Sequence, residues 1–407
     1  MQSLAIPAAA PQRTAVTTRI ESIDLLRGLI MVIMALDHVR DYFHADALIN
    51  DPTDLAKTNA ILFFTRWITH YCAPLFMFLS GISAFLSSQR KSKKDLSFFL
   101  LKRGLWLILL ELTVVHWAWY FNFVGQGVDL TVIWALGLSM ILLAGLIHLP
   151  FWALLSVSVL MVGAHNLLDP IRVSGNDWQG FGWALLHEQH AFTYNGFMVL
   201  VGYPIIPWVG VMALGYCLGT LYTKNYPAEK RRKLLAVLGF SLVGLFILIR
   251  AINIYGDPRV WSSQSTATLT FLSFLNTTKY PPSLLYLLMT IGPALLFLAW
   301  TERKPGWLGQ KLTVFGRVPL FYYILHLYLA HLLAMFATSF SGHAWGDMIL
   351  NYSLWSGRSS AQLEGYGFSL GVTYLVWILV VVLLYPLCKW YDRYKTTHKD
   401  QWWLSYL

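Results

Sequence analysis

The chain has 407 residues, of which 57% are hydrophobic and only 12% are charged, and it contains 18 tryptophans. Soluble domains carry about 25% charged residues, so the composition indicates a polytopic membrane protein rather than two or three soluble domains. The net charge of +10 does not imply a nucleic-acid partner, because in a membrane protein the placement of lysines and arginines matters more than their number.

One membrane domain with a short tail at each end is expected. Residues 1–20 have no apolar core long enough for a signal peptide, so we expect a disordered cytoplasmic tail there. The membrane domain is predicted to cover residues 21–390, followed by a second cytoplasmic tail over residues 391–407. Three cysteines, in or at the ends of apolar segments, argue against a disulfide framework.

About ten segments are apolar and long enough to cross a membrane, which takes roughly 20 residues. They cover residues 22–41, 65–87, 104–121, 131–148, 150–166, 198–222, 234–254, 282–301, 314–338 and 368–388. The sequence therefore predicts an all-α, polytopic integral membrane protein with about ten transmembrane helices.

Basic residues set the predicted orientation. They cluster after the second, sixth, eighth and last of these segments, as in residues 90–94 and 230–233. By the positive-inside rule these clusters face the cytoplasm, which places both termini there. The remaining, longer loops then face outward, and most of the histidines fall at that side, which predicts a titratable outer cavity.

The first segment carries charged residues that are costly inside a membrane and are therefore candidates for function. On a helix, one face collects Asp24, Arg27, Met31, Met34, His38 and Asp41. Arg27 and His38 then lie about 16 Å apart along the helix axis. An arginine near the cytoplasm is suited to hold a phosphate, and an outer histidine, oriented by Asp37 or Asp41, could act as a general base. Alternatively, Arg27 snorkels and His38 is an interfacial histidine.

Three motifs in chain order resemble one family. The run SIDLLRG (residues 22–28), followed by an apolar segment and DH, is similar to the first helix of the transmembrane acyltransferases. It resembles the acyltransferase-3 family, where an arginine and a histidine eleven apart mark the active site, and more closely the bacterial relatives of heparan-α-glucosaminide N-acetyltransferase. ITHYCAPLFMFLSGISAFL (68–86) and GRVPLFYYILHLYLAH (316–331) also resemble those bacterial sequences.

This resemblance implies a donor and an acceptor on opposite sides of the membrane. Acetyl-CoA would come from the cytoplasm, and the acceptor would be an amine or hydroxyl of a sugar or glycan outside. Arg27 matches the family position for the donor, and Asp24 beside it and Arg317 are assigned to the same site. The lysosomal relatives place the active histidine in the first outer loop, so His44 competes with His38 as the base.

Further candidates lie at the predicted outer side. Arg66 and His70 are one helical turn apart and could line the acceptor cavity, and His331 is a second catalytic candidate. Trp178 and Trp183 could form a platform for a sugar, although an aromatic belt at the headgroup level explains both equally well. No metal is expected, because the histidine spacing of the outer loop is short and no HExxH pattern is present.

We therefore predict a multi-pass membrane acetyltransferase, an enzyme of the bacterial inner membrane that uses acetyl-CoA as donor. Its predicted partners are the donor, a sugar or glycan acceptor and membrane lipids, and a homodimer is compatible with the sequence. The rival functions are a solute transporter or flippase, in which the same charges line a solute path, and a structural membrane subunit. O- or N-acetylation, and a direct or an acetyl-histidine route, stay open at this point.

Overall fold

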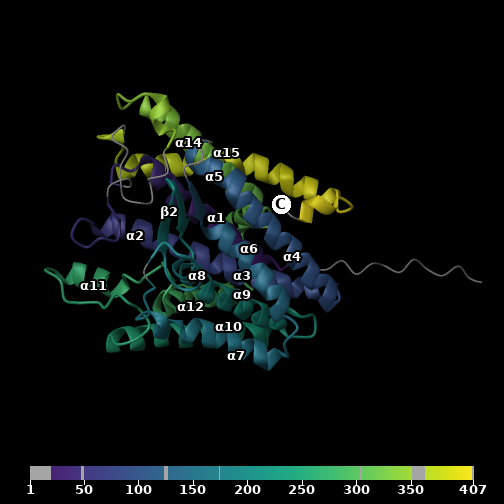
Figure 1. The fold of residues 1–407 in the computed structure, drawn as a ribbon. Coiled ribbons are helices and arrows are strands. Elements are labelled where there is room, and N and C mark those ends of the chain that lie inside the picture. The colour runs from purple at the N-terminus through teal and green to yellow at the C-terminus, as the bar shows by residue number, and fades with distance from the viewer. Residues whose placement is uncertain are drawn as a thin grey trace, which may run out of the picture.

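The structure is a computed structural model that describes residues 20–46, 50–122, 127–173, 175–302, 305–350 and 363–405. Helices make up most of it, and they pack into one bundle with α7 and α10 on one side, α14 and α15 on the opposite side, and α1 between them (Figure 1). The predicted N-terminal tail lies outside the described residues, except for Ile20.

Each predicted span overlaps at least one helix of the described chain, although several of the spans are divided between consecutive helices. In chain order they are α1 (Glu21–Phe43), α2 (Ala60–Thr69), α3 (Cys72–Ser88), α4 (Lys93–Leu110), η1 (Glu111–Val115), α5 (His116–Tyr120), α6 (Val132–Leu146), α7 (Phe151–Gly163), η2 (His165–Leu168), α8 (Trp178–Leu186), α9 (Ile205–Leu218), η3 (Gly219–Tyr222), α10 (Ala228–Ile252), α11 (Ala267–Leu275), α12 (Leu284–Trp300), α13 (Trp307–Arg317), α14 (Pro319–Thr338), η4 (Trp345–Met348), α15 (Leu370–Thr397) and η7 (Trp402–Ser405). α15 continues through the start of the predicted C-terminal tail.

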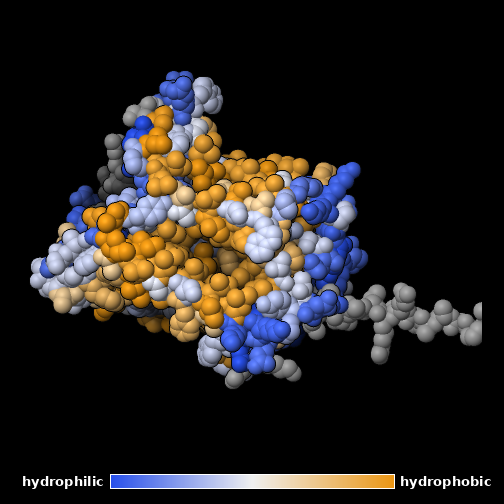
Figure 2. All heavy atoms as spheres, turned by 90° about the horizontal axis from the view of Figure 1, so that it is seen from below, coloured by the Kyte–Doolittle hydropathy of each residue, from blue (hydrophilic) through white to orange (hydrophobic). Residues whose placement is uncertain are grey.

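Five helical segments of the described chain are long and apolar enough to cross a membrane: Ala60–Ser88, Ile205–Tyr222, Ala228–Ile252, Pro319–Thr338 and Leu370–Thr397. α6, α7 and α12 are apolar but shorter. The outward faces of α10 and α15 are apolar, with Phe240 and Leu375 each 68% exposed. A broad apolar surface with a hollow near its middle lies beside strongly hydrophilic regions (Figure 2). These features are those of a membrane-embedded protein.

A small sheet interrupts the helical pattern at the end where α1 finishes. Its strands are β1 (Gly127–Leu130), β2 (His190–Tyr194) and β3 (Phe197–Val201), and the order is β1-β3-β2. β3 pairs parallel with β1 and antiparallel with β2. The all-α prediction is therefore right for the bundle but missed this sheet, and the predicted span 198–222 begins as strand β3 before α9 starts at Ile205.

Two glycines let α1 and α13 approach closely. A Cβ added to Gly28 would overlap the backbone of Leu312, and a Cβ added to Gly316 would overlap the backbone of Asp24. Small residues at such a contact allow membrane helices to pack backbone to backbone. As a consequence, Arg27 Nη1 donates a hydrogen bond to the carbonyl of Gly316 at 3.1 Å, and the inner end of α1 is fixed against α13.

Candidate active site

Two cavities meet inside the bundle. We call the cavity toward the C-terminal end of α1 the outer cavity and the one toward its N-terminal end the inner cavity; their volumes are about 370 and 260 Å³. Both are lined by Met34, Phe76, Val132 and Tyr323. The cavities therefore adjoin at these four side chains, which we call the neck.

One face of α1 lines both cavities. Arg27 and Met31 line the inner cavity, His38 and Asp41 line the outer cavity, and Met34 lies at the neck between them. The face of α1 that was predicted from the sequence is therefore the face that lines the two cavities. Charged side chains at both ends of a buried helix require a polar environment, and each cavity supplies one.

His38 has a histidine as its hydrogen-bond partner. The Nδ1 atom of His38 lies 2.7 Å from Nε2 of His326, and the two ring planes are nearly parallel, with an angle of 7° and ring centroids 4.9 Å apart. The Nδ1 atom of His326 lies 2.9 Å from the main-chain carbonyl oxygen of Tyr322. His38 is 8% exposed and His326 is fully buried. His326 was not among the predicted site residues, although it lies in the third motif of the chain.

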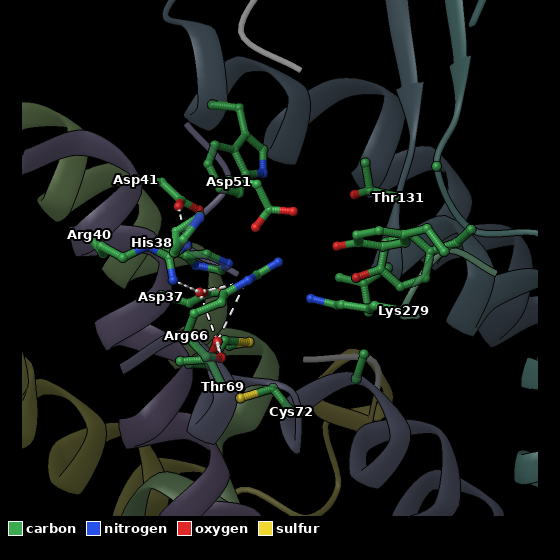
Figure 3. A pocket seen from close by; sticks show the side chains of 18 of the residues that line it. Asp37, His38, Arg40, Asp41, Asp51, Arg66, Thr69, Cys72, Thr131 and Lys279 are labelled. Carbon is green, nitrogen blue, oxygen red and sulfur yellow. Dashed lines mark hydrogen bonds and ion pairs between the residues drawn. The ribbon is translucent and has the colours of Figure 1, made fainter. Parts of the chain in front are cut away.

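The carboxylates that were expected to orient His38 contact arginines instead. Asp37 accepts hydrogen bonds from Arg66 Nη1 at 2.6 and 2.7 Å and from the Thr69 hydroxyl at 2.9 Å. Arg40 contacts Asp37 at 2.9 Å and Asp41 at 2.5 Å. These groups form an ion-pair network along one wall of the outer cavity (Figure 3).

Two loops add further side chains to the lining of the outer cavity. Lys279 points into the cavity from the side facing His38 and Arg66 (Figure 3). Asp51 also lines the cavity, and one of its oxygens accepts hydrogen bonds from the amide and the hydroxyl of Thr53 at 2.8 and 2.9 Å. Burial alone would raise the pKa of Asp51, but the bonds from Thr53 hold it below its ordinary value, so this residue is a carboxylate at neutral pH.

The buried side chain of Arg250 holds these two loops in position through hydrogen bonds. It is 1% exposed, and its guanidinium donates to four main-chain carbonyls, those of Arg259, Ser273, Phe274 and Asn276, at 2.7 to 3.1 Å. The Asn276 side chain in turn donates to the carbonyl of Thr53 at 2.9 Å. One arginine on α10 therefore ties the loop before α12 to the loop that carries Asp51.

The inner cavity is basic. Four cationic side chains line it: Arg27, Arg103, Arg317 and Lys395. Arg27 Nη2 donates to the Ser83 hydroxyl at 2.8 Å, and Ser80, Ser83 and Ser87 line the cavity from α3. Asp24 contacts Arg27 at 3.3 Å and Arg317 at 3.7 Å. The cavity therefore offers guanidinium, ammonium and hydroxyl donors, which suit an anionic ligand such as a phosphate.

A comparison with known families agrees with this geometry. The family model described as heparan-alpha-glucosaminide N-acetyltransferase, catalytic, matches residues 19–253. The chain belongs to this family. The matched range contains α1, α3 and α6, which carry Arg27, His38 and three of the four neck residues. No curated protein matches the chain.

Membership of the heparan-α-glucosaminide N-acetyltransferase family identifies a membrane-embedded acetyltransferase. Residues after 253 lie outside the matched range, yet they complete both cavities. Lys279 and Tyr280 line the outer cavity, Arg317 and Lys395 line the inner one, and Tyr323 lies at the neck. Arg103 and Lys395 were missed in the sequence, because only the packing of α4 and α15 brings them to the cavity.

Four residues that were predicted for the outer side do not line the outer cavity: His44, His70, Trp178 and Trp183. His44 follows α1, accepts a hydrogen bond from the Asp46 amide at 3.3 Å, and pairs with Phe368. Burial lowers the pKa of His44. His70 is 4% exposed, between α2 and α3, with its ring 5.4 Å from that of Tyr286. Trp178 is 87% exposed and Trp183 is partly buried on α8, so neither lines the cavity. Their assigned roles stay predictions.

His331 is held in the protein interior. Its Nδ1 lies 2.8 Å from the carbonyl of Ala118, and its Nε2 lies 2.8 Å from the carbonyl of Met348. Its ring stacks between Tyr42 and Phe121, at 4.6 and 4.1 Å. Both ring nitrogens thus contact main-chain acceptors, and this side chain joins α14 to α5 and η4. This arrangement leaves the catalytic role of His331 a prediction without support from its contacts.

Proposed function

We propose that the protein transfers an acetyl group from cytoplasmic acetyl-CoA to an amine or hydroxyl of a sugar or glycan on the outer side of the membrane. The observation that carries this proposal is the pair of adjoining cavities along one face of α1. Arg27 lies on the basic side, His38 on the outer side, and Met34 at the neck. The acetyl group of a donor bound in the inner cavity would reach the neck, where an acceptor in the outer cavity could attack it.

The donor side of the proposal rests on charge. Coenzyme A carries several phosphate groups, and Arg27, Arg103, Arg317 and Lys395 supply cations for them. The apolar neck would then receive the thioester. Because the neck side chains are mostly apolar, they would also limit the access of water to the donor thioester.

On the acceptor side, His38 acts as the general base. Its Nε2 atom takes a proton from the acceptor amine or hydroxyl, whose nitrogen or oxygen attacks the acetyl carbon. The bond between the acetyl carbon and sulfur then breaks, and the proton passes to the departing CoA thiolate. An acetyl-histidine intermediate on His38 is the alternative route. Arg66, Asp51 and Lys279 orient the acceptor from the walls of the outer cavity.

Contacts between the two ends of the described chain support the proposed orientation. Arg317 contacts Asp24 near the start of α1 at 3.7 Å and Asp392 near the end of α15 at 3.3 Å. The two ends of the described chain therefore share one side of the bundle with the basic inner cavity. With the positive-inside rule, this supports about ten spans in a single domain over residues 21–390, with both termini in the cytoplasm of a bacterial inner membrane.

The decisive experiment uses purified protein in proteoliposomes with labelled acetyl-CoA inside and amino sugars outside. We expect acetylated sugar outside, a loss of roughly 10²- to 10⁴-fold in rate for His38→Ala, and retained CoA binding by that variant. His190→Ala, which changes an exposed histidine, serves as the matched control. Normal transfer by folded His38→Ala would remove His38 as the base. Solute flux without acetylation would instead establish a transporter.

A further inference from the structure

A chain of hydrogen bonds runs from the backbone of α14 to His38. The carbonyl oxygen of Tyr322 lies 2.9 Å from His326 Nδ1, and His326 Nε2 lies 2.7 Å from His38 Nδ1. A carbonyl oxygen can only accept a hydrogen bond, so Nδ1 of His326 carries the hydrogen. In a neutral imidazole the other nitrogen then has the lone pair, and it must accept from Nδ1 of His38.

The geometry points to His326 as the positioning residue that holds His38 in the tautomer with hydrogen on Nδ1 and the basic lone pair on Nε2. This inference rests on the proposed function, in which Nε2 of His38 removes the proton of the acceptor. His326 itself touches neither cavity. It acts through the ring of His38, as the carboxylate of a catalytic triad acts through its histidine.

The alternative tautomer of His38 is disfavoured by this contact. If the hydrogen moved to Nε2, the lone pairs of His38 Nδ1 and His326 Nε2 would face each other at 2.7 Å. The rings of Trp119 and Tyr323 also make T-shaped contacts with the His38 ring, with centroid distances of 4.9 and 6.1 Å, and restrict its rotation. Both the tautomer and the ring plane of His38 are therefore set before a substrate arrives, which preorganises the base.

The nearby carboxylates of Asp37 and Asp41 do not position the ring of His38. Within the described chain, Asp37 bonds to Arg66, Arg40 and Thr69, and Asp41 bonds to Arg40. The hydrogen bond of His38 Nδ1 goes to His326 instead. When Nε2 accepts a proton, the resulting imidazolium keeps its N–H bond to a neutral ring. The proton is thus held without forming a buried ion pair, and it can pass on to the thiolate of CoA.

The test compares two substitutions of His326. Leucine has a similar size but no acceptor atom, whereas the glutamine side chain offers a carbonyl oxygen to His38 Nδ1. We expect His326→Leu to lower kcat roughly 10- to 100-fold, with KM for both substrates within about twofold, since only the reactive tautomer is depleted. His326→Gln should recover most of kcat. His190→Leu, at an exposed histidine, controls for the loss of an imidazole elsewhere.

Two further measurements separate the outcomes. ¹⁵N spectra of histidine-labelled protein, compared with His38→Ala for assignment, should show His38 with hydrogen on Nδ1 in the wild type and mixed tautomers in His326→Leu. Unchanged kcat in folded His326→Leu, or equal losses in the leucine and glutamine variants, would overturn the inference. If His38→Ala keeps full transfer, the proposed base itself fails. If His38→Ala is inactive while His326→Leu is normal, only the positioning role fails.

Discussion

Arg27 and His38 lie on one face of α1 and open onto two different cavities, which adjoin beside Met34. A single helix therefore lines the route from a basic inner space to a polar outer space. Such an arrangement allows a donor and an acceptor to meet without either crossing the membrane. It also means that the neck can be changed without altering either charged site.

Substitution of Met34 by tryptophan should close the neck. Met34 is 4% exposed and lines both cavities, so the larger ring would fill the space where the thioester meets the acceptor. We expect acetyl transfer to fall at least tenfold, because small displacements of reacting groups are costly, while CoA still binds. Met34→Leu, of similar size, should keep activity. Equal transfer by the tryptophan and leucine variants would show that the reaction takes place elsewhere.

Substitution of Arg27 by glutamine should weaken donor binding. A hydrogen bond to a charged group contributes about 1.5–3 kcal/mol, which corresponds to a Kd for CoA raised roughly 10- to 100-fold. Calorimetric titration with CoA would measure this change. Arg232→Gln, at an exposed arginine beyond the inner cavity, should bind CoA normally. Because Arg27 also contacts Ser83 and Gly316, thermal unfolding must show that the variant is folded. An unchanged Kd would exclude Arg27 from the donor site.

The sequence predicted the parts of this site that are local, and it missed those that depend on long-range packing. Helical periodicity alone predicted the shared face of Arg27 and His38. The one-turn spacing of Arg66 and His70 predicted that both residues line a cavity, but only Arg66 does. The partner of His38 was missed because His326 lies 288 positions away, and no local pattern reports that α14 packs on α1. The sequence did offer one signal for this partner: His326 is a histidine near the middle of a predicted span and lies in the third motif.

Loops and helix ends were predicted less well for the same physical reason. Lys279 and Asp51 reach the cavity because Arg250 and Asn276 tie two distant loops together. Glu111 is a further residue whose environment depends on the fold. It accepts hydrogen bonds from the Thr131 hydroxyl and from the amides of Ile133 and Trp134, at the start of α6. Free amides at a helix N-terminus satisfy a buried carboxylate as an arginine would.

Asp37 is expected to matter more for stability than for catalysis. Its carboxylate is shared by Arg40, Arg66 and Thr69, all of them largely buried. Removing one partner of a buried ion pair costs about 3–5 kcal/mol, so Asp37→Asn should markedly lower the Tm of the purified protein. Asp41→Asn should cost at most about 1 kcal/mol, since Asp41 is 27% exposed and contacts only Arg40 among the described residues. Equal Tm values for the two variants would contradict this assignment.

Cys72 provides a test of which side the outer cavity opens to. It lines that cavity, whereas Cys217 and Cys388 line neither cavity. In a Cys217→Ser, Cys388→Ser background, a membrane-impermeant methanethiosulfonate added outside should modify Cys72 and inhibit acetyl transfer. The Cys72→Ser protein should be insensitive to the reagent. Modification only from the cytoplasmic side would reverse the proposed orientation and, with it, the sides of donor and acceptor.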